Sequence, residues 1–366
     1  MSEGDLRTRT EMSNQLPALT ALDSGRFETP AIMKQAVKAH RALAELKGMV
    51  ASVPNPNILI QTLGLREAKD SSEIENIFTT HDELYRELSM PSVDASPAAK
   101  EVARYSQALN AGFDEVRRTG LLTTTQVVAI QAVLEQSDAG IRKLPGTILR
   151  NDAGSTVYTP PSPELLPSLL TDLDKFINDG EIFDADPLVK MALMHHQFES
   201  IHPFYDGNGR TGRIMNVLYL VKEGLLEIPV LYLSRGIVRT KSDYFHFLQS
   251  AREEDRWEDW AKYMLEVVEA TAEDSVRTIT DIRNLMLDFK HRVRKEFKFY
   301  SQDLINNLFR HPYTRIEFIQ NDLGISRVTA AKYLDELSTA GYLTKRKIGN
   351  ANVYVNDALF AILSRS

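Results

Sequence analysis

The 366-residue sequence contains no cysteine, and it contains no apolar run long enough to cross a membrane. The absence of cysteine excludes disulfides, thiolate metal sites and cysteine nucleophiles. The first ten residues, MSEGDLRTRT, also lack the apolar core of a signal peptide. From these absences we expect a cytoplasmic protein without a membrane partner.

The sequence also lacks an overall positive charge. Its formal net charge is −7, which does not indicate general binding to nucleic acid. The charge is uneven, however, because the residues from His291 onward hold 12 Lys/Arg against 7 Asp/Glu. A basic tail on an acidic body indicates a separate module with its own partner. The length exceeds one ordinary domain, so two or three units are expected.

Strand patterns are scarce, and helical spacing of apolar residues dominates from Met33 onward. Residues 1 to about 30 show no sustained periodicity, and we expect them to form a loosely held arm. The fold class is therefore predicted to be mainly α, with one small hairpin in the middle of the chain. The clearest predicted helices begin at Pro97, run over 165–177, begin at Pro187, and extend from Trp257 to about Phe289.

The most informative stretch runs from His202 to Arg213 and reads HPFYDGNGRTGR. Gly207 and Gly209 let the backbone turn tightly and approach a ligand closely. The run that follows has a helical pattern, so the glycines are expected at a helix N-terminus. The free N–H groups and the dipole of a helix N-terminus favour a phosphate.

Charged side chains complete this stretch. Arg210 and Arg213 are three residues apart and share one face of the helix, so both can reach phosphate oxygens. Asp206 offers a hard oxygen ligand of the kind that Mg²⁺ requires. His202 is the candidate base, because an imidazole accepts a hydroxyl proton near neutral pH. A plain glycine-rich turn before a basic helix would explain the glycines but not this combination.

The stretch resembles the Fic signature, H-x-F-x-D/E-G-N-G-R-x-x-R, with all eight fixed positions present. The resemblance implies a mainly helical Fic core that transfers AMP from Mg·ATP to a Ser, Thr or Tyr hydroxyl of a target protein. It implies that His202 is the general base and that Asp206 holds Mg²⁺. The residues that the resemblance assigns to the nucleotide phosphates are Gly207, Asn208, Gly209, Arg210 and Arg213.

On this template the chain has three regions. A helical region over 1–105 contains an inhibitory helix at about 70–77. A Fic catalytic core follows over 106–290, and a winged helix-turn-helix follows over 291–366.

The segment SSEIEN, which contains Ser71, Glu75 and Asn76, resembles the S/T-x-x-x-E-G/N pattern of the Fic inhibitory helix. Ser71 and Glu75 are four residues apart and are expected on one helical face. The resemblance implies that Glu75 pairs with Arg213 and leaves ATP in an unproductive pose. The alternative is an ordinary capping box formed by Ser72 and Glu75. Some relatives use the same glutamate to remove AMP, so deAMPylation is a further alternative.

A hairpin is predicted over 147–161, around a turn at 152–154. It resembles the Fic flap, which implies that Val157, Tyr158 and Thr159 bind an extended segment of the target protein by strand addition. The two prolines that follow are equally consistent with a protected surface loop.

The segment around Tyr244 resembles the helix that frames adenine, and Tyr244 is the candidate nucleoside contact. Arg252 stands where several relatives have an asparagine, which makes the base contacts less secure. Aromatic residues at helical spacing are also typical of a core, so a packing role for Tyr244 stays open. His195 and His196 have no matching carboxylate pattern nearby, and we expect them to be structural.

The residues after Lys290 read as a winged helix. A helix over 315–323 ends at Gly324, Ser326 caps the next helix, and a hairpin over 343–355 turns at Gly349-Asn350. DNA binding and a structural or protein-contact role are both open, as is a homodimer. Basic side chains are expected on the recognition helix and the wing, namely Arg327, Lys332, Lys345, Arg346 and Lys347.

The leading hypothesis is a self-restrained protein adenylyltransferase that uses ATP and Mg²⁺. The alternatives are an ATP-sensing, DNA-binding transcriptional regulator, a Fic transferase with another nucleotide donor, and a kinase of the Doc branch. The intact Gly209 and Arg213 argue against the Doc branch, whose loop departs at those positions.

Overall fold

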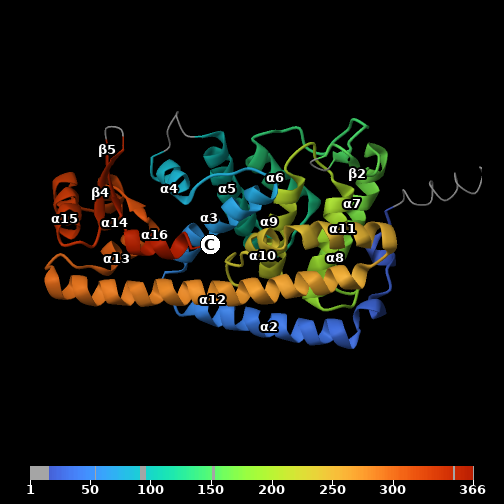
Figure 1. Ribbon diagram of the computed structural model, residues 1–366, viewed down its shortest axis with the longest axis horizontal. Coiled ribbons are helices and arrows are strands. Elements are labelled where there is room, and N and C mark those ends of the chain that lie inside the picture. The colour runs from blue at the N-terminus through green and yellow to red at the C-terminus, as the bar shows by residue number, and fades with distance from the viewer. Residues whose placement is uncertain (1–15, 54, 91–95, 151–152, 349–350, 366) are drawn as a thin grey trace, which may run out of the picture. The chain divides into compact units, whose positions relative to one another are not determined.

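The computed structural model describes residues 16–53, 55–90, 96–150, 153–348 and 351–365. Helices dominate this part of the chain, and short antiparallel strands complete it (Figure 1), so the predicted mainly α fold class is confirmed. The chain divides into two compact units. The first unit joins the described residues up to Leu43 with Gln107–Thr271, and the second joins Ala44–Ser106 with the described residues from Ala272 onward.

The first unit contains the candidate phosphate-binding stretch. Three helices have residues in both units, namely α2 (Pro30–Ala51), α5 (Pro97–Thr119) and α12 (Trp257–Glu296). The other elements of the first unit are η1 (Leu19–Ala21), η2 (Ser24–Phe27), α6 (Thr124–Glu135), β1 (Leu149–Arg150), β2 (Thr156–Tyr158), η3 (Pro163–Leu165), α7 (Leu166–Asn178), α8 (Pro187–Ile201), α9 (Asn208–Lys222), α10 (Leu233–Arg239) and α11 (Lys241–Glu254).

Helices α8 and α9 pack side by side at the centre of this unit (Figure 1). Every residue of α8 from Leu188 to Ile201 is buried, and so is almost every residue of α9. Neither helix has the exposed polar face of a surface helix, because other parts of the unit enclose both on all sides. Asp186 caps α8 by accepting a 2.8 Å hydrogen bond from the Leu188 N–H, and Pro187 occupies the first turn. The predicted start of this helix at Pro187 is confirmed.

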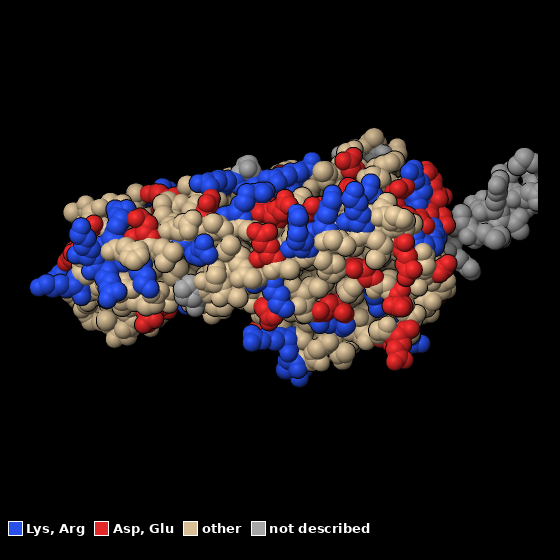
Figure 2. Space-filling view, turned by 90° about the horizontal axis from the view of Figure 1, so that it is seen from below, with Lys and Arg blue, Asp and Glu red and all other residues tan. Residues whose placement is uncertain are grey.

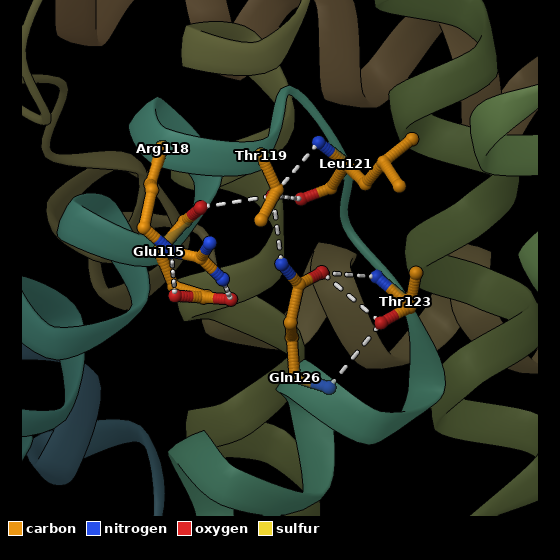
Figure 3. A network of polar contacts seen from close by, with 6 residues as sticks. All are labelled: Glu115, Arg118, Thr119, Leu121, Thr123 and Gln126. Atoms are coloured by element: carbon orange, nitrogen blue, oxygen red, sulfur yellow. Dashed lines mark hydrogen bonds and ion pairs between the residues drawn. The ribbon is translucent and has the colours of Figure 1, made fainter.

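The start of α6 is fixed by a network that joins it to the end of α5 (Figure 3). Thr123 and Gln126 form a capping box, in which the Thr123 N–H donates to the Gln126 side chain at 2.7 Å. The Gln126 amide also donates to the Thr119 hydroxyl at 3.0 Å, and Glu115 pairs with Arg118 one turn earlier. These bonds set where α6 begins, and α6 carries two side chains that reach the candidate site.

Strands β1 and β2 form the hairpin that the sequence predicts. Leu149 pairs with Tyr158 and Arg150 with Thr156, with an irregular register between the two pairs. The Arg150 guanidinium donates to the Gly154 carbonyl at 2.8 Å and closes the turn. Asp152 of the predicted turn lies outside the described residues.

The expected loosely held arm is wrong for residues 16–30, whereas residues 1–15 lie outside the described part of the chain. Leu19 and Phe27 are buried, and the Leu19 N–H donates to Asp172 at 2.8 Å. Arg26 pairs with Glu258 at 2.8 Å. This segment forms 3₁₀ turns of three and four residues, which are too short to produce a readable hydrophobic period.

The second unit consists of helices and one three-stranded sheet. In the sheet, β3 pairs with β5 and β5 pairs with β4, both antiparallel. The predicted helices and hairpin of the C-terminal region are present, although Gly349-Asn350 lies outside the described residues. The elements are α3 (Pro56–Ile74), α4 (His81–Ser89), α13 (Gln302–Arg310), β3 (Tyr313–Thr314), α14 (Ile316–Leu323), α15 (Arg327–Thr339), β4 (Thr344–Ile348), β5 (Ala351–Val355) and α16 (Asp357–Leu363).

Within this unit α4 packs against β3. The rings of Tyr85 and Tyr313 stack with centroids 5.9 Å apart, and the Ser89 hydroxyl donates to the Tyr313 carbonyl at 2.8 Å. A segment from the first third of the chain is thereby part of the same core as the C-terminal sheet. Among the described helices, none combines the length and apolar character needed to span a membrane.

Candidate active site

His202, the candidate base, is the residue that ends α8. Its N–H donates to the Phe198 carbonyl at 2.9 Å, and its backbone is left-handed, with φ 48° and ψ 60°. A residue with a β-carbon rarely adopts this backbone conformation, so the surrounding structure has to stabilise it. The chain can therefore leave the buried helix abruptly and begin the loop that contains the glycines.

The loop is closed by a clasp between Phe204 and Asn208. The Phe204 N–H donates to the Asn208 side-chain carbonyl at 2.8 Å, and the Asn208 side-chain amide donates to the Phe204 carbonyl at 2.9 Å. Phe204 itself is 1% exposed and packs against Phe198, as expected for an anchor. The Asn208 side chain thus shapes the loop, which leaves the backbone of Asn208 as the part that could face a phosphate.

Gly207 is the turning point of the loop. Its φ is +76°, and α9 begins directly after it, with the Thr211 N–H donating to the Gly207 carbonyl at 2.9 Å. The Asp206 carboxylate accepts from the Gly207 N–H at 2.7 Å, yet the Asp206 side chain is 80% exposed. A carboxylate that is exposed beside a helix N-terminus fits a Mg²⁺ ion that also binds nucleotide phosphates.

Arg210 and Arg213 both lie on the first turns of α9, and both are almost fully buried, at 3% and 1% exposure. Arg210 donates to the Glu135 carboxylate at 2.9 Å, and its guanidinium lies 3.9 Å from Asp206. Two buried guanidinium groups beside a helix N-terminus offer charged donors of the kind that bind phosphate oxygens, and Glu135 holds one of them in place.

Two residues of α6 contribute to this site and were missed by the sequence analysis. Glu135 holds Arg210, and the Gln131 amide donates to the Asp206 carbonyl at 3.2 Å. They are four residues apart on one helix face, but that face is also the packing face of an ordinary helix. No feature of the sequence distinguishes them from surface or core residues, because their partners are some 75 positions away.

The hairpin strand β2 is attached to the end of α8 and to α11. The Tyr158 hydroxyl donates to the Ser200 carbonyl at 3.0 Å, and the Arg252 guanidinium lies 4.2 Å from the centre of the Tyr158 ring. The Val157 carbonyl accepts from the Gln249 amide at 3.0 Å. Thr159 follows these two residues at the end of the strand. The predicted flap residues are thus held within reach of the segment that carries the candidate base.

Tyr244 and the two histidines before the loop form a buried polar cluster. His195 shares a 2.9 Å hydrogen bond with the Tyr244 hydroxyl, and His196 donates to the Leu248 carbonyl at 3.2 Å. Burial, followed by the positive charge of Arg213, lowers the pKa of His195 to about 3, so this imidazole is neutral at physiological pH. Tyr244 is 2% exposed, so a contact with adenine would need its ring edge to become accessible, and that role stays a prediction.

The segment that resembles the inhibitory helix closes α3. Ser71 lies in the last turn and is buried, and Glu75 is the residue that ends the helix. Asn76 has a left-handed backbone with φ 61°, and the Ile77 N–H returns to the Ser72 carbonyl at 3.0 Å. This is a Schellman-type helix end, which favours glycine or asparagine after the last helical residue. The geometry therefore explains why the pattern requires Gly or Asn at this position.

The alternative capping box of Ser72 and Glu75 is wrong, because a capping box starts a helix and this segment ends one. The capping box nearby is formed by Thr80 and Glu83 at the start of α4.

Three family models match the chain. The Fic/DOC family N-terminal model matches residues 33–114, the Fic/DOC family model matches residues 121–220, and the model of the SoFic-like protein adenylyltransferase C-terminal domain matches residues 285–359. Over these separate segments the chain is similar to the Fic/DOC family. The central match contains the whole loop from His202 to Arg213.

Curated proteins are similar to this chain at modest identity. Protein adenylyltransferase fic-1 of Caenorhabditis elegans is 34% identical over 94 residues, which cover 26% of this chain and 17% of that protein. Protein adenylyltransferase Fic of Drosophila ananassae is 26% identical over 242 residues, which cover 65% and 43%. The probable protein adenylyltransferase aq_aa38 of Aquifex aeolicus is 29% identical over 187 residues, which cover 50% and 53%. The chain spans about half or less of the length of these relatives.

Solved structures of Fic proteins share the fold. A Fic family protein from Desulfovibrio desulfuricans G20 matches with a TM-score of 0.57 and 20% identity, over 89% of this chain and 96% of that one. Fic-1 from C. elegans matches with a TM-score of 0.54 and 20% identity, over 69% of this chain and 73% of that one. At this identity the likeness concerns the fold.

Proposed function

We propose that this chain is a protein adenylyltransferase, which transfers AMP from Mg·ATP to a Ser, Thr or Tyr hydroxyl of a target protein and of itself. The observation that carries the proposal is the joint placement of His202 at the end of α8 and two buried arginines at the start of α9. The names of the similar proteins point to the same reaction.

In the proposed reaction the acceptor hydroxyl oxygen bonds to the α-phosphorus of ATP, and the bond to the pyrophosphate oxygen breaks. His202 takes the hydroxyl proton. The backbone from Gly207 to Gly209 binds the phosphates, while Arg210 and Arg213 balance the charge of the leaving pyrophosphate. Asp206 is the residue that would hold Mg²⁺, and the ion would supply further positive charge between the phosphates.

The first prediction concerns the base. His202→Ala should lower AMP incorporation by about 10²–10⁴-fold, the usual contribution of a positioned base, while ATP still binds. Incorporation is measured by intact mass, and ATP binding by calorimetry. The matched control is His246→Ala, which removes an exposed histidine of α11 and should leave transfer unchanged. Undiminished AMP incorporation by the His202 variant would remove the basis for the proposed mechanism.

The nucleotide donor is tested by incubating the Glu75→Gly protein with each of the four nucleoside triphosphates and Mg²⁺. A mass increase of one AMP with ATP alone supports the proposal. An increase with another nucleotide supports a transferase with a different donor. DeAMPylation needs a separate arm with the wild-type protein, which keeps Glu75: loss of AMP from a previously modified protein in the presence of wild type, and not of Glu75→Gly, would show that activity.

We also propose that Glu75 restrains the enzyme, with Ser71 and Asn76 shaping the helix end that presents it. The supporting observations are the S-x-x-x-E-N pattern and the left-handed Asn76 that the pattern requires. The resemblance implies that the partner of Glu75 is Arg213.

The region after Lys290 is proposed to be a winged helix that serves mainly for protein contacts. Three of its five predicted DNA-contacting side chains are paired with carboxylates of the same module: Arg327 with Glu317 at 2.7 Å, Lys345 with Asp335 at 2.7 Å, and Arg346 with Asp357 at 3.0 Å. A paired cation releases fewer counterions on binding DNA, which weakens the main source of DNA affinity.

The DNA-binding alternative rests on the recognition helix and the wing, and further exposed cations lie at the end of α12 and just beyond it, namely Arg292, Arg294, Lys295 and Lys298. Figure 2 shows Lys and Arg side chains gathered at the left of the view. A steep loss of duplex DNA affinity with rising salt would favour the regulator. An absence of binding at low salt would favour protein contacts. Cytoplasmic location and a homodimer are likewise proposals.

A further inference from the structure

Arg142 is a buried cation in the connection between α6 and β1. It is 2% exposed, and burial lowers the pKa of its guanidinium. A buried guanidinium ordinarily pairs with a carboxylate, because the cost of removing the charge from water is then balanced. In the described part of the chain, however, the hydrogen-bond partners of Arg142 are backbone carbonyls.

These carbonyls belong to two functional segments. The Arg142 Nε donates to the His202 carbonyl at 2.8 Å, and one Nη donates both to the Ile201 carbonyl at 3.3 Å and to the Pro161 carbonyl at 2.5 Å. The Arg142 backbone N–H donates to the Pro203 carbonyl at 2.9 Å. One residue therefore binds three consecutive carbonyls around the candidate base and the last residue of the predicted flap.

The carbonyls of Ile201 and His202 lie at the C-terminal end of α8, where a cationic donor is favourable. Ile201 is the last residue of α8 and His202 ends it, so their carbonyls have no helical partner and require a donor. The left-handed backbone of His202 also has to be held in place, since it is an uncommon conformation for a residue with a side chain. A planar guanidinium with several donors in a fixed fork meets both requirements, whereas a lysine ammonium could bind fewer carbonyls at once.

We propose that Arg142 is the positioning residue that sets the spacing between the flap and the imidazole of His202. This role rests on the proposed adenylyl transfer. A target strand bound to β2 presents its hydroxyl from the flap side, and His202 receives the proton from the side of α8. Arg142 is bonded to both sides, so it fixes the distance over which the hydroxyl has to approach the base.

Two further contacts hold the same junction. Arg252 donates to the Ser200 hydroxyl at 2.8 Å while it covers the ring of Tyr158. Arg252 thus contacts the last residue of β2, and Arg142 binds the chain three residues later, at Pro161. Of these two arginines, Arg142 bonds to His202, whereas Arg252 bonds to Ser200. A test of the positioning role therefore uses Arg142.

The test uses the full chain with the Glu75→Gly change and measures self-modification in a single turnover at a series of ATP concentrations. Arg142→Met removes all the side-chain bonds, and Arg142→Lys keeps the charge with a reduced set of bonds. We expect the maximal rate of Arg142→Met to fall by about 10²-fold, the effect of a displacement of about 1 Å, while the ATP concentration at half-maximal rate stays within about twofold. Arg142→Lys should recover part of the rate.

The matched control is Lys190→Met, which removes another buried cation from the same unit. Lys190 lies on α8 over the ring of Phe176, far along the helix from His202. The melting temperature of this variant should fall as much as that of the Arg142 variants. Its maximal rate of self-modification should stay unchanged. If Arg142→Met does not fold, Arg142→Lys carries the comparison.

An unchanged maximal rate in the folded Arg142 variants would overturn the positioning role. The positioning role would also be wrong if the lower rate of the Arg142 variants came from weaker ATP binding or from unfolded protein. If the parent protein itself transfers no AMP to any residue, the proposed function fails first. The two failures are distinguishable, because the Glu75→Gly parent stays active if only the role of Arg142 is wrong and is inactive if the proposed function is wrong.

Discussion

Gly207 is under two independent constraints. Its φ of +76° favours glycine, and a β-carbon built there would lie 2.3 Å from the Glu135 carboxylate oxygen that accepts from Arg210. A side chain at this position would strain the backbone and would also push Glu135 away from Arg210. The geometry of the loop from His202 to Arg213 therefore requires a residue without a β-carbon at this position.

The substitution Gly207→Ala should weaken ATP binding by about tenfold or more, equivalent to one lost charge-assisted hydrogen bond. The matched control is Gly224→Ala, because Gly224 also has a positive φ, of 68°, but has nothing within 4 Å of the added carbon. Both variants should lose about 1–2 kcal/mol of stability through backbone strain. Calorimetric titration with Mg·ATP measures the difference. Equal ATP affinity in the two variants would contradict the role of the Glu135 contact.

The sequence predicted the residues that lie within one contiguous motif, from His202 to Arg213. Spacing along the chain determines how they meet, so a linear pattern is sufficient. Glu135, Gln131 and Arg142 could not be predicted in this way. They reach the loop from other segments, and two of them bind backbone carbonyls, which every residue type offers.

At the scale of elements, α2 and α8 are joined by His40 and Asp186. His40 donates to the Asp186 carboxylate at 2.8 Å, and the same carboxylate caps α8. The hydrogen bond to Asp186 raises the pKa of His40 despite partial burial. Burial acts to raise the pKa of Asp186, but its bonds to His40 and to the start of α8 lower it on balance. The pair that supports the start of α8 is therefore charged in mildly acidic solution.

This pair predicts a pH-dependent contribution to stability. Because the pKa of His40 is higher in the folded than in the unfolded protein, the contribution is complete below the unfolded pKa of about 6.5 and is lost as the pH rises through the folded pKa. His40→Gln should lower the melting temperature by about 2 °C or less near pH 6, since the pair is partly exposed, and by less near pH 8. Scanning calorimetry of both proteins across this range measures the effect. A difference that grows with pH would contradict it.

Long elements followed the sequence more closely than short ones. Helices α5 and α8 begin at the predicted prolines, α7 begins within one residue of the predicted start, and α12 begins at Trp257 as predicted but continues to Glu296, beyond the predicted end near Phe289. A long helix repeats its apolar pattern over several turns. The 3₁₀ turns before α2 were missed, because three or four residues contain no period. Their burial depends on partners such as Asp172, which is more than 150 positions away.

For the whole molecule, the central question is whether the chain restrains itself. Glu75→Gly should raise self-modification by about 5- to 150-fold, the range of a coupling free energy of about 1–3 kcal/mol. The matched control is Glu73→Gly, which places the same helix-weakening residue two positions earlier, where Glu73 pairs with Lys69 at 2.8 Å. Intact-mass time courses with Mg·ATP give both rates. Equal rates in wild type and Glu75→Gly would show that Glu75 ends α3 and does not restrain the enzyme.

The fold class was predictable for the whole chain, because helical spacing covers most of its length. The three expected regions, 1–105, 106–290 and 291–366, stay predictions. The compact units combine segments from distant parts of the sequence, as the stacking of Tyr85 on Tyr313 shows within the second unit. A linear pattern cannot report such pairings, since they arise only when the chain has folded.

Val157, the middle residue of β2, offers a site for a spectroscopic label. Val157 is 41% exposed and its carbonyl is turned toward α11. Because the chain has no native thiol, a single cysteine placed at this position would be the sole site for a maleimide dye or spin label. The label would report whether β2 moves when Mg·ATP or a candidate target protein is added.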